Sequence, residues 1–326
     1  MYTPLGLVVR MLPAMSAFEE ELTKRRHANE VHSINAVVGA AVPYAVNHIY
    51  QKCGLQTGTK LKAQEERGVL GMSYDFAITT VVASHWKESK QVFAFPKELC
   101  NLLMEMDMDD FEIGWELFDH LPYQSFYLEL LDNELVDGIM VRYENTPKRV
   151  ILYTICGKPQ KVGFEINAGI IDPRENNSFK EFFETEVYCS KADFNNPHVM
   201  LVRQMLAFLL QACMYLCAKN ADIEENPVQK QIYRPATTVR NKFSEVRKWD
   251  VGMRVVKEYK DTKKNSQSEA DTTSGTARRR PRQHWRKAHW HTYWVGQGRA
   301  KKELKFIAPV LVNDVDDDTP VVIHNH

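Results

Sequence analysis

The chain lacks a net charge, because its 42 Lys and Arg residues balance its 42 Asp and Glu residues. A neutral chain of 326 residues has no overall electrostatic field that draws it to nucleic acid. Its hydrophobic fraction of 44% and its charged fraction of 26% are ordinary for a globular protein. We therefore expect one large or two modest folded domains, on which any basic surface is a local cluster of charge.

Recognisable catalytic motifs are absent. The sequence contains no P-loop, no dinucleotide-binding fingerprint, no nucleophile elbow and no H-E-x-x-H motif, and it has no internal repeat. These absences leave no motif for nucleotide-dependent or metallopeptidase chemistry. We expect neither a cofactor nor a bound metal ion.

The cysteine pattern gives no sign of a disulfide framework. No two of the six cysteines form a C-x-x-C motif. The apolar stretch at residues 1–15 is short and lacks the basic start of a secretory signal. We expect reduced and mostly buried thiols in a cytoplasmic protein. The six cysteines are Cys53, Cys100, Cys156, Cys189, Cys213 and Cys217.

Charge is nevertheless concentrated in two segments of opposite sign. The acidic segment, residues 105–144, has twelve Asp and Glu residues against Arg142 alone. Residues 278–302 have nine Lys and Arg residues and no acid. Segments of opposite charge are able to pair with each other within the chain or to face two different partners.

The first 120 residues predict a mainly helical region. Residues 16–51 have helical spacing, with Ser16 as the cap and an interruption at Pro43. Residues 60–86 suggest a second helix, although their β-branched middle leaves a strand open. We expect a short helix at 97–106 and a short helix or turn at 111–119.

Residues 121–259 predict an antiparallel β-meander with one buried helix. Turn signals separate four β-rich runs, at 126–131, 138–143, 150–155 and 162–167. A short amphipathic helix is expected at 178–187, and Asn196 and Pro197 begin the most apolar helix, residues 197–219. That helix is long enough to span a bilayer, but Arg203 and Gln211 favour a buried core helix.

Residues 260–283 are poor in apolar side chains and rich in Lys, Ser, Thr and Arg, which predicts a disordered linker. A hairpin at 284–313 and a loose tail at 314–326 complete the chain. The predicted class is α+β: a helical N-terminal half, a small antiparallel meander with a central buried helix, a flexible linker and a C-terminal basic aromatic β-hairpin.

In the C-terminal block, residues 278–313, the basic segment is interleaved with the rings of Trp285, Trp290, Tyr293 and Trp294 and with three histidines. Gly296 and Gly298 allow a tight turn between two extended runs, whose side chains alternate between two faces. The tryptophans, Trp294 included, either stack on bases, fill a peptide pocket or pack into the core, and the cations contact phosphate or an acidic surface. The expected faces are His289, His291 and Tyr293 on one side, and Trp290, Thr292 and Trp294 on the other.

Three interpretations of the histidines stay open. His289 and His291 share a face and imidazole is a common metal ligand, but no Cys lies nearby and a third ligand has to come from far away. One imidazole is able to serve as general acid or base in RNA cleavage, for which His284, His289 and His291 are the catalytic candidates. In the third interpretation the histidines make structural hydrogen bonds.

The C-terminal block resembles the signature of the second type V-A anti-CRISPR family. The pattern is R-x-H-W-R-x-x-H-W-H-x-Y-W-x-G-x-G over residues 282–298, then a charged spacer and P-x-L-V-N over residues 309–313. A weaker likeness covers Leu121, Pro122, Tyr127 and Glu129, with Gln124 and Ser125 where many relatives carry Trp and Cys. The candidate binding residues of the block are Arg282, His284, Trp285, Arg286, His289, Trp290, His291, Tyr293, Trp294, Arg299 and Asn313.

This resemblance implies an inhibitor, made by a phage or plasmid, that interferes with production of a type V-A CRISPR effector nuclease in a bacterial cell. The implied partner is the N-terminal peptide of the nascent effector, and loss of the effector's messenger RNA follows. An acidic, partly apolar surface would hold the peptide, and the basic hairpin would contact ribosome or messenger RNA. We expect no membrane partner.

Two hypotheses of other classes stand beside the inhibitor. The first is an RNA-cleaving enzyme of the toxin type, with His284, His289 or His291 as acid and base and Arg286 or Arg299 on the phosphate. The second is a plain nucleic-acid-binding accessory protein, whose affinity depends steeply on salt. We expect no enzymatic activity, and a ribonuclease if there is one.

Overall fold

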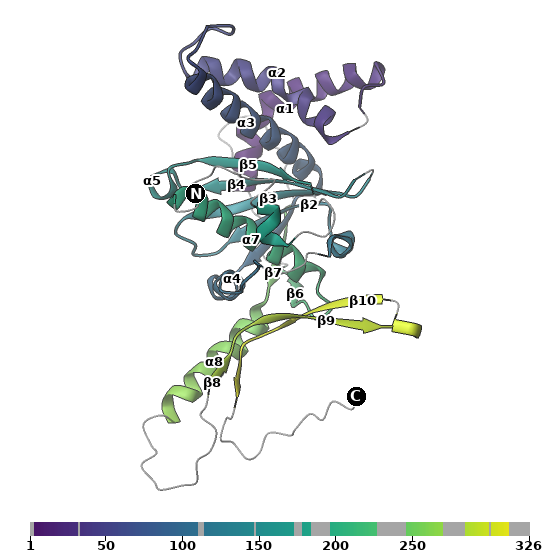
Figure 1. The fold of residues 1–326 in the computed structure, drawn as a ribbon, viewed down its shortest axis with the longest axis vertical. Coiled ribbons are helices and arrows are strands. Elements are labelled where there is room, and N and C mark those ends of the chain that lie inside the picture. Colours follow the sequence, from purple (N-terminus) through teal and green to yellow (C-terminus); the bar gives the residue numbers. More distant parts are fainter. Residues whose placement is uncertain are drawn as a thin grey trace.

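A computed structural model describes residues 3–31, 33–109, 114–146, 148–172, 178–183, 196–226, 246–269, 284–299 and 301–312. A β-sheet lies between two helical layers, and the C-terminal strands lie at the end of the molecule opposite to helices α1–α3 (Figure 1). The structure is of the mixed α and β class, with a helical N-terminal part and a small antiparallel sheet near the C-terminus.

Three long helices form the first layer: α1 (Pro4–His27), α2 (Ile34–Lys52) and α3 (Ala63–Ser89). The Thr3 hydroxyl caps α1 by accepting a hydrogen bond from the Gly6 amide at 3.1 Å, and Pro4 suits the first helical position. The prediction that the helix begins at Ser16 is therefore wrong. Pro43 lies inside α2 without ending it, so the interruption falls between α1 and α2 instead.

The β-branched middle of residues 60–86 is helical. Ile78, Val81 and Val82 lie in α3 and are fully buried, because this part of α3 crosses the sheet. Packing against the strands rather than intrinsic propensity decides the outcome between helix and strand here.

The central sheet has seven strands in the order β5-β4-β3-β2-β1-β7-β6. The predicted meander corresponds to the antiparallel strands β2 (Ser125–Leu130), β3 (Val136–Glu144), β4 (Val150–Gly157) and β5 (Ile166–Ile171). The last strand begins at Ile166 rather than at residue 162, because Pro159–Val162 form the short helix α5 and Gly163 turns the chain with a φ of 78°.

The sheet is larger than predicted and it is mixed. Strand β1 (Gln91–Phe95) pairs in parallel with β2 on one side and with β7 (Arg247–Val251) on the other, and β6 (Ile223–Glu225) closes the edge. Alternation along β1 places Val92 in the core under α1–α3, and Phe93 and Phe95 in the core on the opposite face.

The second layer contains α4 (Lys97–Met104), η1 (Trp115–His120), α6 (Phe179–Phe182) and α7 (Pro197–Cys217). Helix α7 is long and apolar enough to cross a membrane, yet 72% of its most apolar window is buried inside the protein. The Asn196 side chain caps it, and the Gln211 amide donates to the Leu103 carbonyl at 2.6 Å. The prediction of a central buried helix packed on the meander is therefore confirmed.

The predicted linker is helical in its first part. Helix α8 (Met253–Glu269) covers residues that composition assigned to disorder, and the Asp222 carboxylate holds its start by accepting from the Arg254 amide at 2.6 Å. The remaining linker residues 270–283, residues 184–187 of the predicted amphipathic helix and the tail from residue 314 lie outside the described residues.

The cysteines in the described part of the chain form no disulfide. Burial raises the pKa of the Cys100, Cys156 and Cys217 thiols to about 12, so these groups stay protonated near neutral pH. Cys53 is exposed, and Cys189 lies outside the described residues.

Candidate functional site

The C-terminal block forms a hairpin, as predicted. Strand β9 (His289–Val295) pairs antiparallel with β10 (Lys301–Ile307), and the short helix η3 (Gln297–Arg299) joins them. Gly296 and Gly298 supply φ values of 84° and 71° at the turn. Strands β8 (His284–Arg286) and β11 (Val310–Val312) pair beside the hairpin, and neither pair joins the central sheet.

The inner face of the hairpin packs on the core around α7. Leu304 and Phe306 are 6% and 3% exposed, which places them among the buried side chains of that core. The Phe306 ring meets Tyr215 and Trp290 edge to face, each at a centroid distance of 5.3 Å. The hairpin is therefore built into the fold.

Polar contacts fix the register of this docking. The side-chain nitrogen of Asn220 donates to the Phe306 carbonyl at 2.8 Å, and its side-chain oxygen accepts from the Phe306 backbone amide at 3.0 Å. The side chain thus pairs with β10 as the backbone of a neighbouring strand would. The Lys219 amide donates to the Leu304 carbonyl at 3.0 Å, and the Lys219 ammonium lies 2.8 Å from Glu303. These bonds join the end of α7 to β10 over several residues.

The outer face of the hairpin presents rings and cations to solvent. The ring centres of His291 and Tyr293 lie 4.2 Å apart, and the Lys305 ammonium lies 4.7 Å from the Tyr293 ring centre. The alternation predicted from the sequence is thus correct. A cation over an aromatic ring is held by the electrostatic quadrupole of that ring.

Trp294 lies at the tip and is 58% exposed, with the Lys302 ammonium 5.7 Å from its ring centre. The expectation that Trp294 packs into the core is wrong. It shares a face with Trp290, but the core ends before it, so Trp290 is the tryptophan of β9 that contacts buried residues.

The histidines differ in their surroundings. His289 Nδ1 lies 3.2 Å from the Lys287 carbonyl, which can only accept, so the neutral tautomer that fits this contact has its proton on Nδ1 and Nε2 as an acceptor. His291 is exposed beside Tyr293. Among the described residues no three His, Cys, Asp or Glu side chains gather in a group that could hold a metal ion.

Four candidate binding residues are described only in part or not at all. Arg282 and Asn313 lie outside the described residues, and of His284 and Trp285 only the backbone in β8 is described. Arg299 is exposed in η3 with a φ of 54°.

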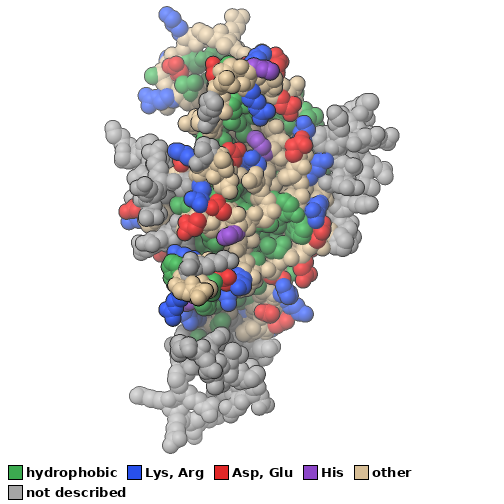
Figure 2. Space-filling view, turned by 90° about the vertical axis from the view of Figure 1, so that its right-hand side faces the viewer, with side chains coloured by type: hydrophobic (Ala, Val, Ile, Leu, Met, Phe, Trp, Pro, Cys, Tyr) green, Lys and Arg blue, Asp and Glu red, His purple; other side chains and the backbone are tan. Residues whose placement is uncertain are grey.

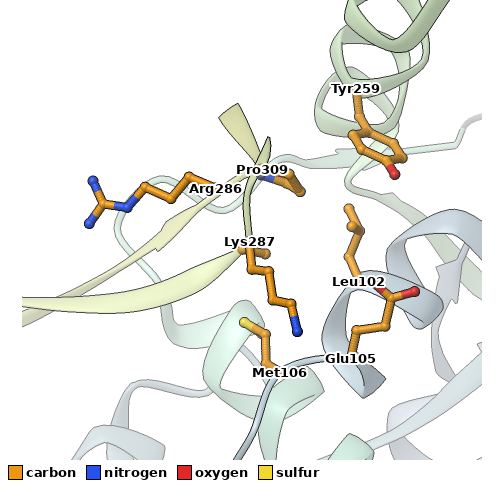
Figure 3. Close-up of a pocket in the computed structure, with 8 residues that line it drawn as sticks. Leu102, Glu105, Met106, Tyr259, Arg286, Lys287 and Pro309 are labelled. Carbon is orange, nitrogen blue, oxygen red and sulfur yellow. The ribbon is translucent and has the colours of Figure 1, made fainter. Parts of the chain in front are cut away.

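Arg286 lies at a small pocket of about 100 Å³ between the C-terminal block, α4 and α8 (Figure 3). In this view the Arg286 side chain points away from the pocket, whereas Lys287 points into it toward Met106. Leu102 and Pro309 also line the pocket. The arrangement ties the block to α4 and leaves the Arg286 guanidinium outside.

The acidic segment does not pair with the C-terminal block in the part of the chain that the structure describes. Among the described residues, four of its carboxylates form ion pairs with cations from other places in the fold, and a fifth pairs with Arg142 of the segment itself. Figure 2 shows acidic and basic side chains interspersed over one face of the molecule. The five ion pairs are Asp109–Arg203, Asp119–Arg149, Glu129–Lys248, Asp137–Lys158 and Glu144–Arg142.

Sequence reasoning missed a second polar site, the β2–α3 pocket. It has a volume of about 450 Å³ and lies where the end of α3 meets the start of β2 and the end of β3. The side chains come from four elements far apart in the chain, so no local sequence pattern predicts that they lie together. They are Glu19, Ser84, His85, Glu88, Ser89, Tyr123, Gln124, Ser125 and Arg142.

Comparison with known proteins assigns the family. The family described as the Anti-CRISPR type V subtype A2 family, AcrVA2-like, matches residues 93–314, which is more than half of the chain. The chain therefore belongs to the AcrVA2-like family of anti-CRISPR proteins, as the C-terminal block suggested.

A solved structure supports the same fold. The crystal structure of AcrVA2 matches with a TM-score of 0.51 and 14% sequence identity, over 95% of this chain and 97% of that chain. The likeness thus includes the α1–α3 layer, which precedes the residues matched by the family. None of the curated proteins matches this chain.

Proposed function

We propose that this anti-CRISPR protein lowers production of a type V-A effector nuclease by recognising the N-terminal peptide of the nascent effector, with loss of the effector's messenger RNA. The proposal combines the family with the geometry of the hairpin. It sets the action in the cytoplasm of a bacterial host, at the translating ribosome.

The observation that carries the proposal is a pair of cation–aromatic contacts that a firmly docked hairpin presents on its outer face and at its tip. Lys302 and Lys305 lie against the rings of Trp294 and Tyr293, and neither lysine forms an ion pair with a described residue. Cations that are free of carboxylates can neutralise phosphates, and exposed rings can stack on unpaired bases. This combination suits contact with ribosomal or messenger RNA.

A ribonuclease remains the second candidate because His289 leaves Nε2 as an acceptor on the face that also carries His291 and Lys305. An acceptor nitrogen can take the proton of a ribose hydroxyl, and a nearby ammonium can stabilise the developing charge on phosphate. This candidate predicts that the purified protein cuts RNA without ribosomes and that His289→Ala abolishes the cut while RNA binding persists.

The test uses cells that carry a type V-A effector gene. Effector messenger RNA and effector protein are measured with and without this chain, beside a control gene whose first codons are changed to encode a different peptide. We expect both levels to fall for the native gene and to be spared for the recoded one. Equal loss from both genes, or no loss from either, would contradict peptide recognition.

A second control separates peptide from RNA sequence. The first codons are replaced by synonymous codons, so that the messenger RNA changes while the peptide stays the same. We expect loss of this messenger RNA as for the native gene. If the messenger RNA of the synonymous gene is spared, the chain recognises RNA sequence. That result would favour the hypothesis of a nucleic-acid-binding accessory protein.

A further inference from the structure

The β2–α3 pocket contains a buried hydroxyl without a partner. Ser125 is only 3% exposed, and its Oγ makes no hydrogen bond with a described residue. Ser125 pairs with Arg142 across β2 and β3, so the two side chains emerge on the same face of the sheet and both line the pocket. A buried hydroxyl left without a partner costs free energy, which a bound polar group in the pocket would recover.

His85 adds a second acceptor. Its Nδ1 lies 2.8 Å from the Val81 carbonyl, which fixes the proton on Nδ1 and leaves Nε2 as an acceptor. Burial, together with the nearby Arg142 guanidinium, lowers the pKa of His85, so the ring is neutral near pH 7. A neutral ring is able to accept a hydrogen bond from a ligand.

Carboxylates complete the lining. Glu88 is exposed at the end of α3, and Glu19 of α1 lies 3.7 Å from Lys87 in a loose ion pair. Arg142, the one cation among the described residues of the lining, is already engaged, because its Nε lies 3.3 Å from Glu144 and its Nη1 lies 3.5 Å from the Gln124 side-chain oxygen. The lining therefore offers acceptors and negative charge.

We propose that the β2–α3 pocket binds a primary ammonium group of a peptide, either a lysine side chain or a free amino terminus. An ammonium carries three N–H donors, which match the Ser125 hydroxyl, His85 Nε2 and the Glu88 carboxylate. The inference rests on the proposed function for its peptide partner, and it names the chemistry that this partner has to supply.

The first test probes the pocket without any peptide. n-Butylammonium chloride is titrated into the full chain while the NMR signals of His85 and Ser125 are followed, with tetramethylammonium, which has no N–H donor, as the control. We expect shifts only with n-butylammonium. Equal responses to both cations, or none to either, would overturn the inference.

The second test uses variants. Ser125→Ala removes a hydroxyl that has no partner in the free protein, so we expect an unchanged or higher melting temperature. Ser125→Ala and Glu88→Gln should each weaken n-butylammonium binding by about tenfold or more. The matched control is Glu134→Gln, an exposed carboxylate in the turn between β2 and β3, which should bind as the wild type does. Equal weakening in this control would contradict the assignment.

The third test identifies the source of the ammonium. Peptides with the first residues of the effector are compared by calorimetry in three forms: unmodified, with a formylated amino terminus, and with norleucine in place of lysine. We expect one modification to weaken binding by about tenfold or more. If the peptides bind wild type and Ser125→Ala equally, the pocket assignment fails and the proposed function stands. If n-butylammonium binds but no peptide does, the proposed function fails instead.

Discussion

The acidic segment and the C-terminal block carry similar densities of opposite charge, but the fold uses them differently. The acidic segment supplies strands β2 and β3, and five of its twelve carboxylates pair with described cations, as Glu129 does with Lys248 at 2.6 Å. Two cations of the C-terminal block, Lys302 and Lys305, lie over aromatic rings and form no ion pair with a described residue. The paired carboxylates of the first segment join parts of the fold, whereas Lys302 and Lys305 of the second are free for a partner.

This difference shows why a net charge of zero says little about binding. Charges have a structural role where they pair with each other within the fold and a recognition role where a docked hairpin leaves them unpaired. Substitutions of paired or buried residues should therefore change stability, whereas substitutions of exposed residues in the C-terminal block should change function.

The largest effect is expected from Phe306→Ala. Phe306 is 3% exposed and contacts Tyr215 and Trp290, so its truncation removes the centre of the docked face and should lower the free energy of unfolding by about 3–5 kcal/mol. Trp294→Ala at the exposed tip should change it by no more than about 0.5 kcal/mol. Chemical denaturation measures both. Equal costs would mean that the hairpin docks differently.

A smaller loss is expected from Lys248→Met. This side chain is 10% exposed and pairs with Glu129, so its replacement leaves a largely buried carboxylate without its cation, at a cost of about 3 kcal/mol. The matched change in the C-terminal block, Lys302→Met, should cost less than about 0.5 kcal/mol. If both lysines cost the same, the division between structural and free charge is wrong.

An acid outside both segments sharpens the comparison. Burial raises the pKa of Asp75 to about 6, although the Ala168 amide donates to it at 3.3 Å. The folded state therefore holds this proton more tightly than the unfolded chain does, and its contribution to stability falls as pH rises from about 4 through 6. Asp75→Asn should raise the free energy of unfolding by about 2 kcal/mol at pH 7. Denaturation at pH 4 should show most of that gain lost.

The smallest effect on stability, with a large effect on function, is expected from His291→Ala. His291 is exposed and contacts Tyr293 on the outer face, so the melting temperature should stay close to that of the wild type. Loss of effector messenger RNA in cells should be strongly reduced. A variant that still removes the messenger RNA would exclude this face from the site.

The sequence predicts the local part of this fold well. The meander, the apolar helix α7 and the C-terminal hairpin each have a period and turn signals within a short stretch of chain. Strand β1 escapes prediction because it is five residues long, buried on both faces and paired in parallel with β7, whose residues lie far away in the sequence. Such pairing leaves no local signal.

Two further errors have physical causes. Helix α8 is polar around most of its surface, and composition alone does not separate an exposed helix from a disordered linker. Alternation along β9 sorts Trp290 and Trp294 onto one face, but only the packed structure shows that the core ends between them. The β2–α3 pocket was beyond sequence reasoning for a similar reason, since Ser125 and His85 meet only in the fold.

The most direct test of the central claim reverses the charge of the two lysines that lie over aromatic rings of the hairpin. Effector messenger RNA is measured in cells that express the double variant Lys302→Glu/Lys305→Glu, or the control Lys60→Glu/Lys97→Glu on exposed lysines elsewhere, with melting temperatures matched to the wild type. We predict that the control removes the messenger RNA as the wild type does and that the hairpin variant spares it. If both variants removed the messenger RNA equally, the claim that the C-terminal block contacts RNA would be contradicted.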